Sequence, residues 1–545
     1  MRRSHILLLL AALLAALAVR APGILWGYNF PGGWYGHHVD EYAHVQLAKG
    51  LINPYLKLEW QHPYPKGMAT HVAVPVHAWN LVRGKLRVSS AEDIPAPPAT
   101  IRLIVIGRVV SVLYGAASLL VVFLLARNLF SDPRVSLLAA WIFAFSGLHV
   151  TQSHFFVSDV ASLFWSLLGT YLLLREDEVQ EPARSNFLYW AAFCFGFAVG
   201  LKLTIPILFS LLCVALLRPP RITRTIQAGV FLFAGFIVVN FASYSPMDIA
   251  KTLMKGVNDP FLWSFVDNVK LYLIELPSYL SLPVVLLAVL GTAVLTRKLF
   301  RDFPVSKRLA VLIIVVLPLL IHLYLVVFKL DHFARHIIPF IPWAAMAAAA
   351  SLLRMADFLR ARGLHPAFLY AVFFGYLALF VYDGERVFLK EPRNQAGRWL
   401  QENIPQGTKI YWRTHSEFPG YRALNFSMEG RPPVLLMEMY RVNPVLSGMG
   451  WRNSFPRDYR YIFEARSQKY VDDTQALFKG ETEYRQVARF QEGYFMPEFV
   501  WVDRLIGNRS RNYVTEIVIF TRPLTPDDTT GDSASPAGDG AKSKN

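Results

Sequence analysis

The sequence predicts a mostly α-helical, polytopic membrane protein that carries a small soluble α/β domain near its C-terminal end. Of its 545 residues, 54% are hydrophobic and 17% are charged, whereas charged residues make up about a quarter of a soluble globular domain. Apolar runs such as residues 6–19, 109–126 and 309–327 approach the roughly 20 residues that cross a bilayer. After about residue 390 such runs stop, which marks the predicted change to a soluble domain.

The hydropathy criterion gives about eleven membrane spans. The first follows Met1-Arg2-Arg3 and could also be read as a signal peptide; we interpret it as a retained span. The approximate limits are 5–25, 101–126, 135–151, 157–174, 187–201, 202–217, 225–243, 278–297, 309–328, 337–353 and 366–382.

The basic residues of the loops predict the orientation of these spans. If the spans alternate, one set of loops collects most of the Lys and Arg, and that side is expected to be cytoplasmic. The other side then receives the first loop, residues 26–100, together with every acid and cation considered below except Arg108. The basic loop residues are Arg127, Arg134, Arg218, Arg221, Arg224, Arg297, Lys298, Arg301, Lys307, Arg308, Arg354, Arg360 and Arg362.

Three domains are predicted: a transmembrane catalytic domain over 1–390, an extracytoplasmic α/β domain over 391–524, and a disordered tail over 525–545. Ala396, Trp399, Leu400 and Ile404 have helical spacing, and Tyr513, Thr515, Ile517 and Ile519 alternate as in a strand. The tail is rich in Thr, Asp, Ser, Gly, Ala and Lys, a composition typical of disorder.

The composition also excludes several classes of partner and site. The net charge of +16 is explained by basic loops beside the membrane, so no nucleic-acid partner is expected. The two cysteines, Cys194 and Cys213, lie in apolar spans, so neither a disulfide framework nor a Cys-based metal site is expected.

The carboxylate pair Asp40-Glu41 is the strongest candidate for catalysis. It follows the first span and opens an expected helix that Gly50 could end. Acids in a first helical turn are stabilised by the helix dipole, but this explains one acid better than a pair beside a membrane. A carboxylate here could accept a proton from an attacking hydroxyl or help to bind a divalent cation.

A third candidate acid, Asp159, opens a later span on the same predicted side. It could be a simple helix cap. Because it is expected on the same side of the membrane as Asp40, a functional role is the alternative. A divalent metal site is open at this stage, with Asp40, His44 and Asp159 as its candidate ligands. Asp40 and His44 share a helix face at positions i and i+4. No other cofactor is expected.

Cations on the same side are candidates for binding a phosphate. Lys66 belongs to the proline-stiffened stretch His62-Pro63-Tyr64-Pro65-Lys66, Lys202 lies between two apolar spans, and Arg335-His336 lies at the edge of another. The alternatives are a surface turn for Lys66, snorkelling for Lys202 and a helix pair with Asp331 for Arg335. Arg108, inside a span, is expected to be costly unless it is hydrogen-bonded within the protein.

At these residues the chain resembles the GT-C superfamily of membrane glycosyltransferases, in the branch of protein O-mannosyltransferases and lipid A aminoarabinose transferases (glycosyltransferase family 39-like). The matching elements are Asp40-Glu41, His62–Lys66, the Asp159 segment, Gly200-Leu201-Lys202-Leu203-Thr204, and Arg335-His336 with Pro339 and Pro342. Residues 393–405 resemble the start of the outer domain in such proteins. The Trp-Trp-Asp signature of oligosaccharyltransferases is not seen there.

The resemblance implies an enzyme that moves a sugar from a polyprenyl-phosphate donor to a hydroxyl of a lipid, glycan or protein acceptor, with inversion. It implies Asp40 as the base, Glu41 as its support, Asp159 shaping the acceptor or metal site, and Lys66, Lys202, Arg335 and His336 near the donor phosphate. The site would face outward from a bacterial or archaeal inner or plasma membrane. The alternatives are a transporter or flippase for a lipid-linked envelope precursor, and a non-catalytic envelope-assembly scaffold; acids clustered on one face disfavour transport.

Overall fold

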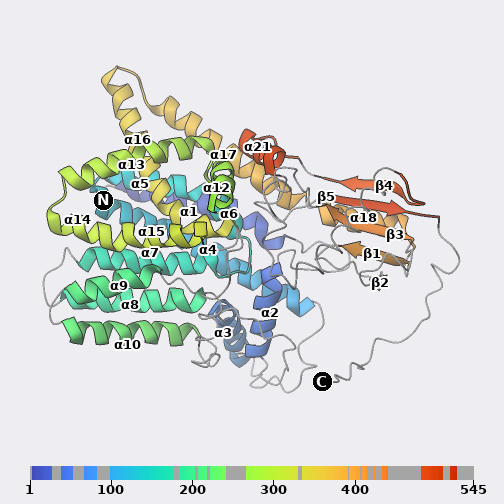
Figure 1. The fold of residues 1–545 in the computed structure, drawn as a ribbon, viewed down its shortest axis with the longest axis horizontal. Coiled ribbons are helices and arrows are strands. Elements are labelled where there is room, and N and C mark those ends of the chain that lie inside the picture. The colour runs from blue at the N-terminus through green and yellow to red at the C-terminus, as the bar shows by residue number, and fades with distance from the viewer. Residues whose placement is uncertain are drawn as a thin grey trace.

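A computed structural model of the chain shows a bundle of long helices with a five-stranded sheet at one end (Figure 1). It describes residues 3–26, 39–52, 67–82, 98–176, 183–202, 206–217, 221–240, 265–328, 334–390, 392–405, 408–413, 422–423, 433–439, 480–491, 493–506 and 516–523. The tail predicted over 525–545 lies outside these residues. The described part is 84% helical, which confirms the mostly α-helical fold.

The first half of the bundle comprises the following elements: α1 (Arg3–Arg20), η1 (Ala21–Leu25), α2 (Val39–Ile52), α3 (Gly67–Val82), α4 (Pro98–Phe130), α5 (Pro133–Ala144), α6 (Gly147–Gln152), α7 (Asp159–Glu176), α8 (Ala183–Leu201), α9 (Pro206–Leu217) and α10 (Arg221–Val239). The second half comprises α12 (Phe265–Leu280), α13 (Leu282–Arg301), α14 (Val305–Val311), the π-helical turn η3 (Leu312–Val316), α15 (Leu317–Phe328), η4 (Ala334–Phe340), α16 (Ile341–Ala361) and α17 (Ala367–Leu389).

Seven helical segments in the described ranges are long and apolar enough to cross a membrane, and three shorter apolar helices accompany them. The chain is therefore an integral, multi-pass membrane protein. The number eleven stays a prediction. The span expected over 135–151 is divided into α5 and α6 at Phe145-Ser146, and α2 and α3 add helices inside the predicted first loop.

Glycines let neighbouring helices approach until their backbones touch. A Cβ on Gly196 of α8 would lie 1.8 Å from the carbonyl oxygen of Leu232 in α10, and one on Gly291 of α13 would lie 1.9 Å from that of Ala347 in α16. Close helix contact through small residues is typical of membrane bundles, where lipid supplies no hydrophobic drive for association. These crossings fix the helices whose ends carry the polar residues.

The C-terminal part forms a mixed sheet in the order β2-β1-β3-β5-β4. Its strands are β1 (Lys409–Arg413), β2 (Arg422–Ala423), β3 (Val434–Met439), β4 (Arg485–Phe490) and β5 (Glu516–Thr521). Strand β1 runs parallel to β2 and β3, whereas β5 runs antiparallel to β3 and β4. Helix α18 (Pro392–Asn403) packs Ala396 and Leu400 against the sheet, as the helical spacing predicts.

Helix α21 (Pro497–Ile506) fastens the C-terminal part to the bundle. Its Glu498 carboxylate accepts hydrogen bonds from the Leu282 backbone N–H at 2.9 Å and from the Tyr376 hydroxyl at 2.7 Å. Asp383 of α17, fully buried, accepts from the backbone N–H groups of Phe495 and Met496 at 2.9 and 2.8 Å. The sheet is thus held at one end of the bundle, although its side of the membrane stays a prediction.

The two ends of the bundle differ in their polar residues. We call the end that holds Arg20, Asp159, Lys202 and Arg335 the site end; α2, α3 and the sheet lie there (Figure 1). We call the opposite end, where α4 and α7 finish and the Lys298 ammonium binds the Phe130 carbonyl at 2.7 Å, the basic end. Among the described residues, Asp159, Lys202 and Arg335 thus lie at the end opposite Lys298 and Lys307.

Candidate active site

An ion pair between Asp159 and Lys202 lies at the site end. Asp159 is the first residue of α7 and its side chain is 7% exposed, whereas that of Lys202, just after α8, is 35% exposed. The Lys202 ammonium donates to Asp159 Oδ1, and the Ser162 hydroxyl donates to the Ala198 carbonyl at 3.1 Å. The start of α7 and the end of α8 are therefore joined by two polar contacts, and the Lys202 side chain is partly exposed to water.

Arg335 and His336 lie close enough to act electrostatically on the Asp159 carboxylate. Both belong to the short helix η4, which begins at Ala334, and both are half-buried. The His322 side chain of α15 holds this segment through a 2.9 Å hydrogen bond between its Nε2 and the His336 carbonyl. Among the described side chains, the Asp159 carboxylate is thus paired with Lys202 and lies within electrostatic range of Arg335 and His336. The net positive charge of these described groups favours an anion such as phosphate.

Glu41 forms a buried, two-pronged ion pair with Arg108. The Arg108 Nε and Nη2 atoms lie 2.7 and 2.8 Å from the two carboxylate oxygens, and the side chains are 2% and 0% exposed. Arg108 also donates to the Ile24 and Trp26 carbonyls. The charge of Arg108 within the bundle is thus satisfied inside the protein, and the geometry favours Glu41 as a positioning residue.

Glu41 also connects the two acid-bearing helices. Its Oε1 accepts a hydrogen bond from the Phe156 backbone N–H at 2.8 Å, three residues before Asp159. Asp40 precedes Glu41 in the first turn of α2, although its side chain lies outside the described residues. The first turn of α2 is therefore anchored next to the segment that leads into α7.

Gly67 brings the next candidate stretch to the same place. It opens α3 directly after Lys66, and a Cβ on Gly67 would lie 2.6 Å from the Gly200 carbonyl oxygen. The Asn240 amide donates to the same carbonyl at 2.9 Å. Lys66 itself lies outside the described residues, but the residue that follows it packs against the turn that carries Lys202.

A metal site is not formed by the described residues: no group of three or more His, Cys, Asp or Glu side chains among them is placed to hold an ion. His44 is buried and packs against Phe156, with 5.5 Å between ring centroids. Asp159 already has the Lys202 ammonium on one oxygen, which opposes binding of a second cation there.

Sequence reasoning missed a buried polar cluster between α1, α6 and α17. Arg20 lies 2.9 Å from His149 Nδ1 and donates to the Ser153 hydroxyl at 3.3 Å. His154 Nδ1 lies 3.0 Å from a carboxylate oxygen of Glu385. Burial, followed by the charges of Arg20 and Arg108, lowers the pKa of His154 to about 3. The signal in the sequence was two histidines five residues apart beside Asp159.

Comparison with protein families gives one match. Residues 103–244 match the sequence model of the dolichyl-phosphate-mannose-protein mannosyltransferases. The matched stretch contains Arg108, Asp159 and Lys202. This match supports a membrane glycosyltransferase of the GT-C superfamily. The transporter, flippase and scaffold alternatives are not favoured. No curated protein sequence matches the chain.

Among solved structures, the chain is similar to an oligosaccharyltransferase of Archaeoglobus fulgidus. Its apo form is 15% identical, with a TM-score of 0.47 over 74% of this chain and 59% of that one. Its complex with an inhibitory peptide and a dolichol-phosphate is 13% identical, with a TM-score of 0.46 over 74% and 58%. The chain thus spans less than two thirds of the length of these structures.

Proposed function

We propose that this GT-C glycosyltransferase transfers a sugar from a polyprenyl-phosphate-linked donor to a hydroxyl group of a lipid, glycan or protein acceptor, at the extracytoplasmic face. The observation that carries the proposal is the cluster of Lys202, Arg335 and His336 around the single carboxylate of Asp159. It lies at the end of a membrane bundle, where the phosphate of a lipid-linked donor would sit. The family match covers two of these residues, Asp159 and Lys202.

In the proposed reaction the acceptor hydroxyl attacks the anomeric carbon of the sugar. The new bond joins acceptor oxygen to carbon, the bond from carbon to phosphate oxygen breaks, and polyprenyl phosphate leaves with the electron pair. A single displacement of this kind inverts the anomeric centre. Asp40 acts as the general base and accepts the proton of the attacking hydroxyl as the new bond forms.

The cations have their role at the leaving group. Negative charge develops on the phosphate as the sugar departs, and a fixed positive charge stabilises that transition state. Lys202 and Arg335 supply this charge, His336 supplies a hydrogen-bonding group beside them, and Lys66 is the candidate cation that precedes α3. Arg is suited to grip two phosphate oxygens at once.

Asp159 and Glu41 have supporting roles. The Asp159 carboxylate holds the Lys202 ammonium at the N-terminus of α7. Without this ion pair the lysine side chain would sample many rotamers. Glu41 fixes the first turn of α2 through Arg108 and Phe156, and so sets the position of the preceding Asp40 backbone. Asp159 is also available to shape the acceptor site.

The test is transfer by the purified chain in detergent or liposomes, measured as release of polyprenyl phosphate from labelled polyprenyl-phosphate sugars. We expect Lys202→Gln to lower the rate by about 10- to 100-fold, because a charge-assisted hydrogen bond to the leaving group contributes about 1.5–3 kcal/mol. Lys390→Gln is the matched control, since Lys390 is an exposed lysine after α17 at the same end. It should leave transfer unchanged.

Two results would contradict the proposal. One is movement of the lipid-linked sugar between leaflets by the wild-type chain without release of polyprenyl phosphate, which would favour a flippase. The other is an equal loss of transfer in Lys202→Gln and Lys390→Gln, which would separate the reaction from the Asp159 cluster.

A further inference from the structure

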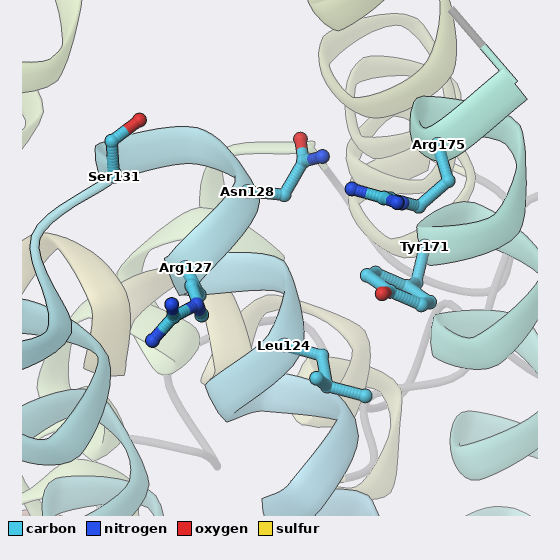
Figure 2. A pocket seen from close by; sticks show the side chains of 6 residues that line it. All are labelled: Leu124, Arg127, Asn128, Ser131, Tyr171 and Arg175. Carbon is cyan, nitrogen blue, oxygen red and sulfur yellow. The ribbon is translucent and has the colours of Figure 1, made fainter. Parts of the chain in front are cut away.

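A cavity at the basic end, opposite the candidate active site, has no role in the proposed reaction. It lies between the C-terminal ends of α4 and α7 and has a volume of about 400 Å³. Figure 2 shows Arg175 extending from α7 toward Asn128 of α4, with Tyr171 beneath it and Leu124 deeper in the gap. The residues that line it are Leu124, Arg127, Asn128, Ser131, Tyr171 and Arg175.

Asn128 is the first sign that this cavity receives a polar ligand. Its side chain is 9% exposed, and neither its amide nitrogen nor its amide oxygen has a hydrogen-bond partner in the described structure. A buried amide without partners costs about 1–3 kcal/mol, so such a group calls for an explanation. A ligand in the cavity that accepts a hydrogen bond would satisfy the amide nitrogen.

The charge around the cavity is positive. Arg127 and Arg175 line it, and the Lys307 ammonium binds the Asn128 carbonyl at 3.3 Å. The acid next to Arg175, Glu176, is buried in an ion pair with Arg224 and does not face the cavity as a free carboxylate. The nearby Asp132 accepts from the Arg134 side chain and backbone, at 3.0 and 2.8 Å.

The lining residues change from polar at the helix ends to more apolar one turn deeper, as a binding site for an amphiphilic molecule would. Arg127, Asn128 and Ser131 lie in the last turn of α4 and just beyond it, and Arg175 lies in the last turn of α7. Leu124 and Tyr171 lie one turn deeper in each helix, toward the apolar middle of the bundle. A ligand that fits has a charged head at the end of the helices and an apolar part that points inward.

We propose that this cavity binds the phosphate-bearing headgroup of an anionic membrane lipid. The Arg175 guanidinium, which points toward Asn128 (Figure 2), and the Asn128 amide contact the phosphate oxygens, and Leu124 and Tyr171 contact the start of the acyl chains. Basic pockets beside membrane helices attract anionic headgroups. The site lies apart from the Asp159 cluster, so it is independent of sugar transfer.

Lipid titrations of the purified full chain, followed by native mass spectrometry, test the proposal. Phosphatidylglycerol should bind and phosphatidylcholine should bind much more weakly, because the second adds a cation to the headgroup. Arg175→Gln should lower the affinity for phosphatidylglycerol about tenfold, the effect of one charge-assisted hydrogen bond. Arg354→Gln, an exposed arginine on α16 at the same end, is the matched control and should bind as the wild type.

Asn128→Leu keeps the branched side-chain shape with the same number of heavy atoms and removes the amide. Without lipid this variant should be as stable as the wild type or more so, because the amide has no partner to lose. Its affinity for phosphatidylglycerol should nevertheless be lower by about fivefold or more, because one hydrogen bond is lost. A variant that folds well and loses lipid separates binding from misfolding.

Three outcomes would overturn the proposal. The first is equal binding of phosphatidylglycerol by the wild type, Arg175→Gln and Asn128→Leu. The second is an equal loss of affinity in Arg175→Gln and Arg354→Gln, which would show only general attraction to a basic surface. The third is binding of inorganic phosphate that phosphatidylglycerol cannot displace, which would make the site one for a free anion.

Discussion

Glu41→Gln should destabilise the protein, because it removes the only carboxylate that the described structure places on the buried Arg108 guanidinium. Both side chains are at most 2% exposed, and three hydrogen bonds of 2.7, 2.8 and 2.8 Å converge on Glu41. Breaking a buried ion pair by removing one partner costs about 3–5 kcal/mol. Arg108 keeps its contacts with the Ile24 and Trp26 carbonyls, so we expect the lower end, about 3 kcal/mol.

The assay is thermal or denaturant unfolding of the purified protein, with Glu41→Gln, Arg108→Met and the double variant Glu41→Leu/Arg108→Met. Replacing both charges by apolar groups is often neutral or stabilising. The double variant should therefore recover most of the stability that each single change loses. A normal stability for Glu41→Gln together with abolished transfer would refute the reasoning, because Glu41 would then act on the substrate and not on the helix.

Three further predictions concern the site end. Asp40→Asn should lower transfer by at least about 10²-fold, the usual contribution of a general base, with unchanged thermal stability; near-normal turnover would redirect attention to Glu41. Arg335→Ala should raise the donor KM about tenfold, by loss of a charge-assisted contact, with the acceptor KM unchanged; an unaltered donor KM would leave the phosphate to Lys66 and Lys202. His154 is buried, and its pKa in the folded state is lowered to about 3. Below about pH 6.5, the unfolded pKa, the unfolded chain binds a proton that the folded state does not bind. The free energy of unfolding should therefore fall by about 2 kcal/mol between pH 7 and pH 5. His154→Gln should flatten that part of the stability profile, and identical slopes for variant and wild type would contradict the assignment.

The sequence predicted which residues gather at one end of the bundle, because alternation of spans and basic loops determines side. Asp159, Lys202 and Arg335 share the site end as that rule requires. The rule predicts on which side of the membrane a residue lies and not how far it is from another residue. The direct contact between Asp159 and Lys202 could therefore not be predicted from it. That contact depends on how α7 and α8 pack, through groups such as Ser162 and the Ala198 carbonyl.

The roles of Glu41 and Arg108 were harder to predict from sequence, because they lie 67 residues apart. Each looked unusual alone: one as a second acid in a pair, the other as a cation inside a span. Only the fold shows that the two charges satisfy each other. Similarly, the helix over 392–403 follows from local apolar spacing, whereas the parallel pairing of β1 with β3 depends on long-range packing that periodicity does not encode.

Four cations at the site end, Arg20, Arg108, Lys202 and Arg335, divide into two kinds by burial and by the contacts that the structure gives them. Arg20 and Arg108 are fully buried and bind backbone carbonyls and side chains inside the bundle. Lys202 and Arg335 are partly exposed, and each lies where the chain leaves or enters a helix. A lipid phosphate stays at the boundary between the apolar layer and water, while its polyprenyl tail remains among the helices. The second kind of cation reaches that boundary, because part of its side chain is exposed. The same reasoning assigns Asp159 to the placement of Lys202, since a carboxylate that neutralised both cations would leave no field to attract the donor.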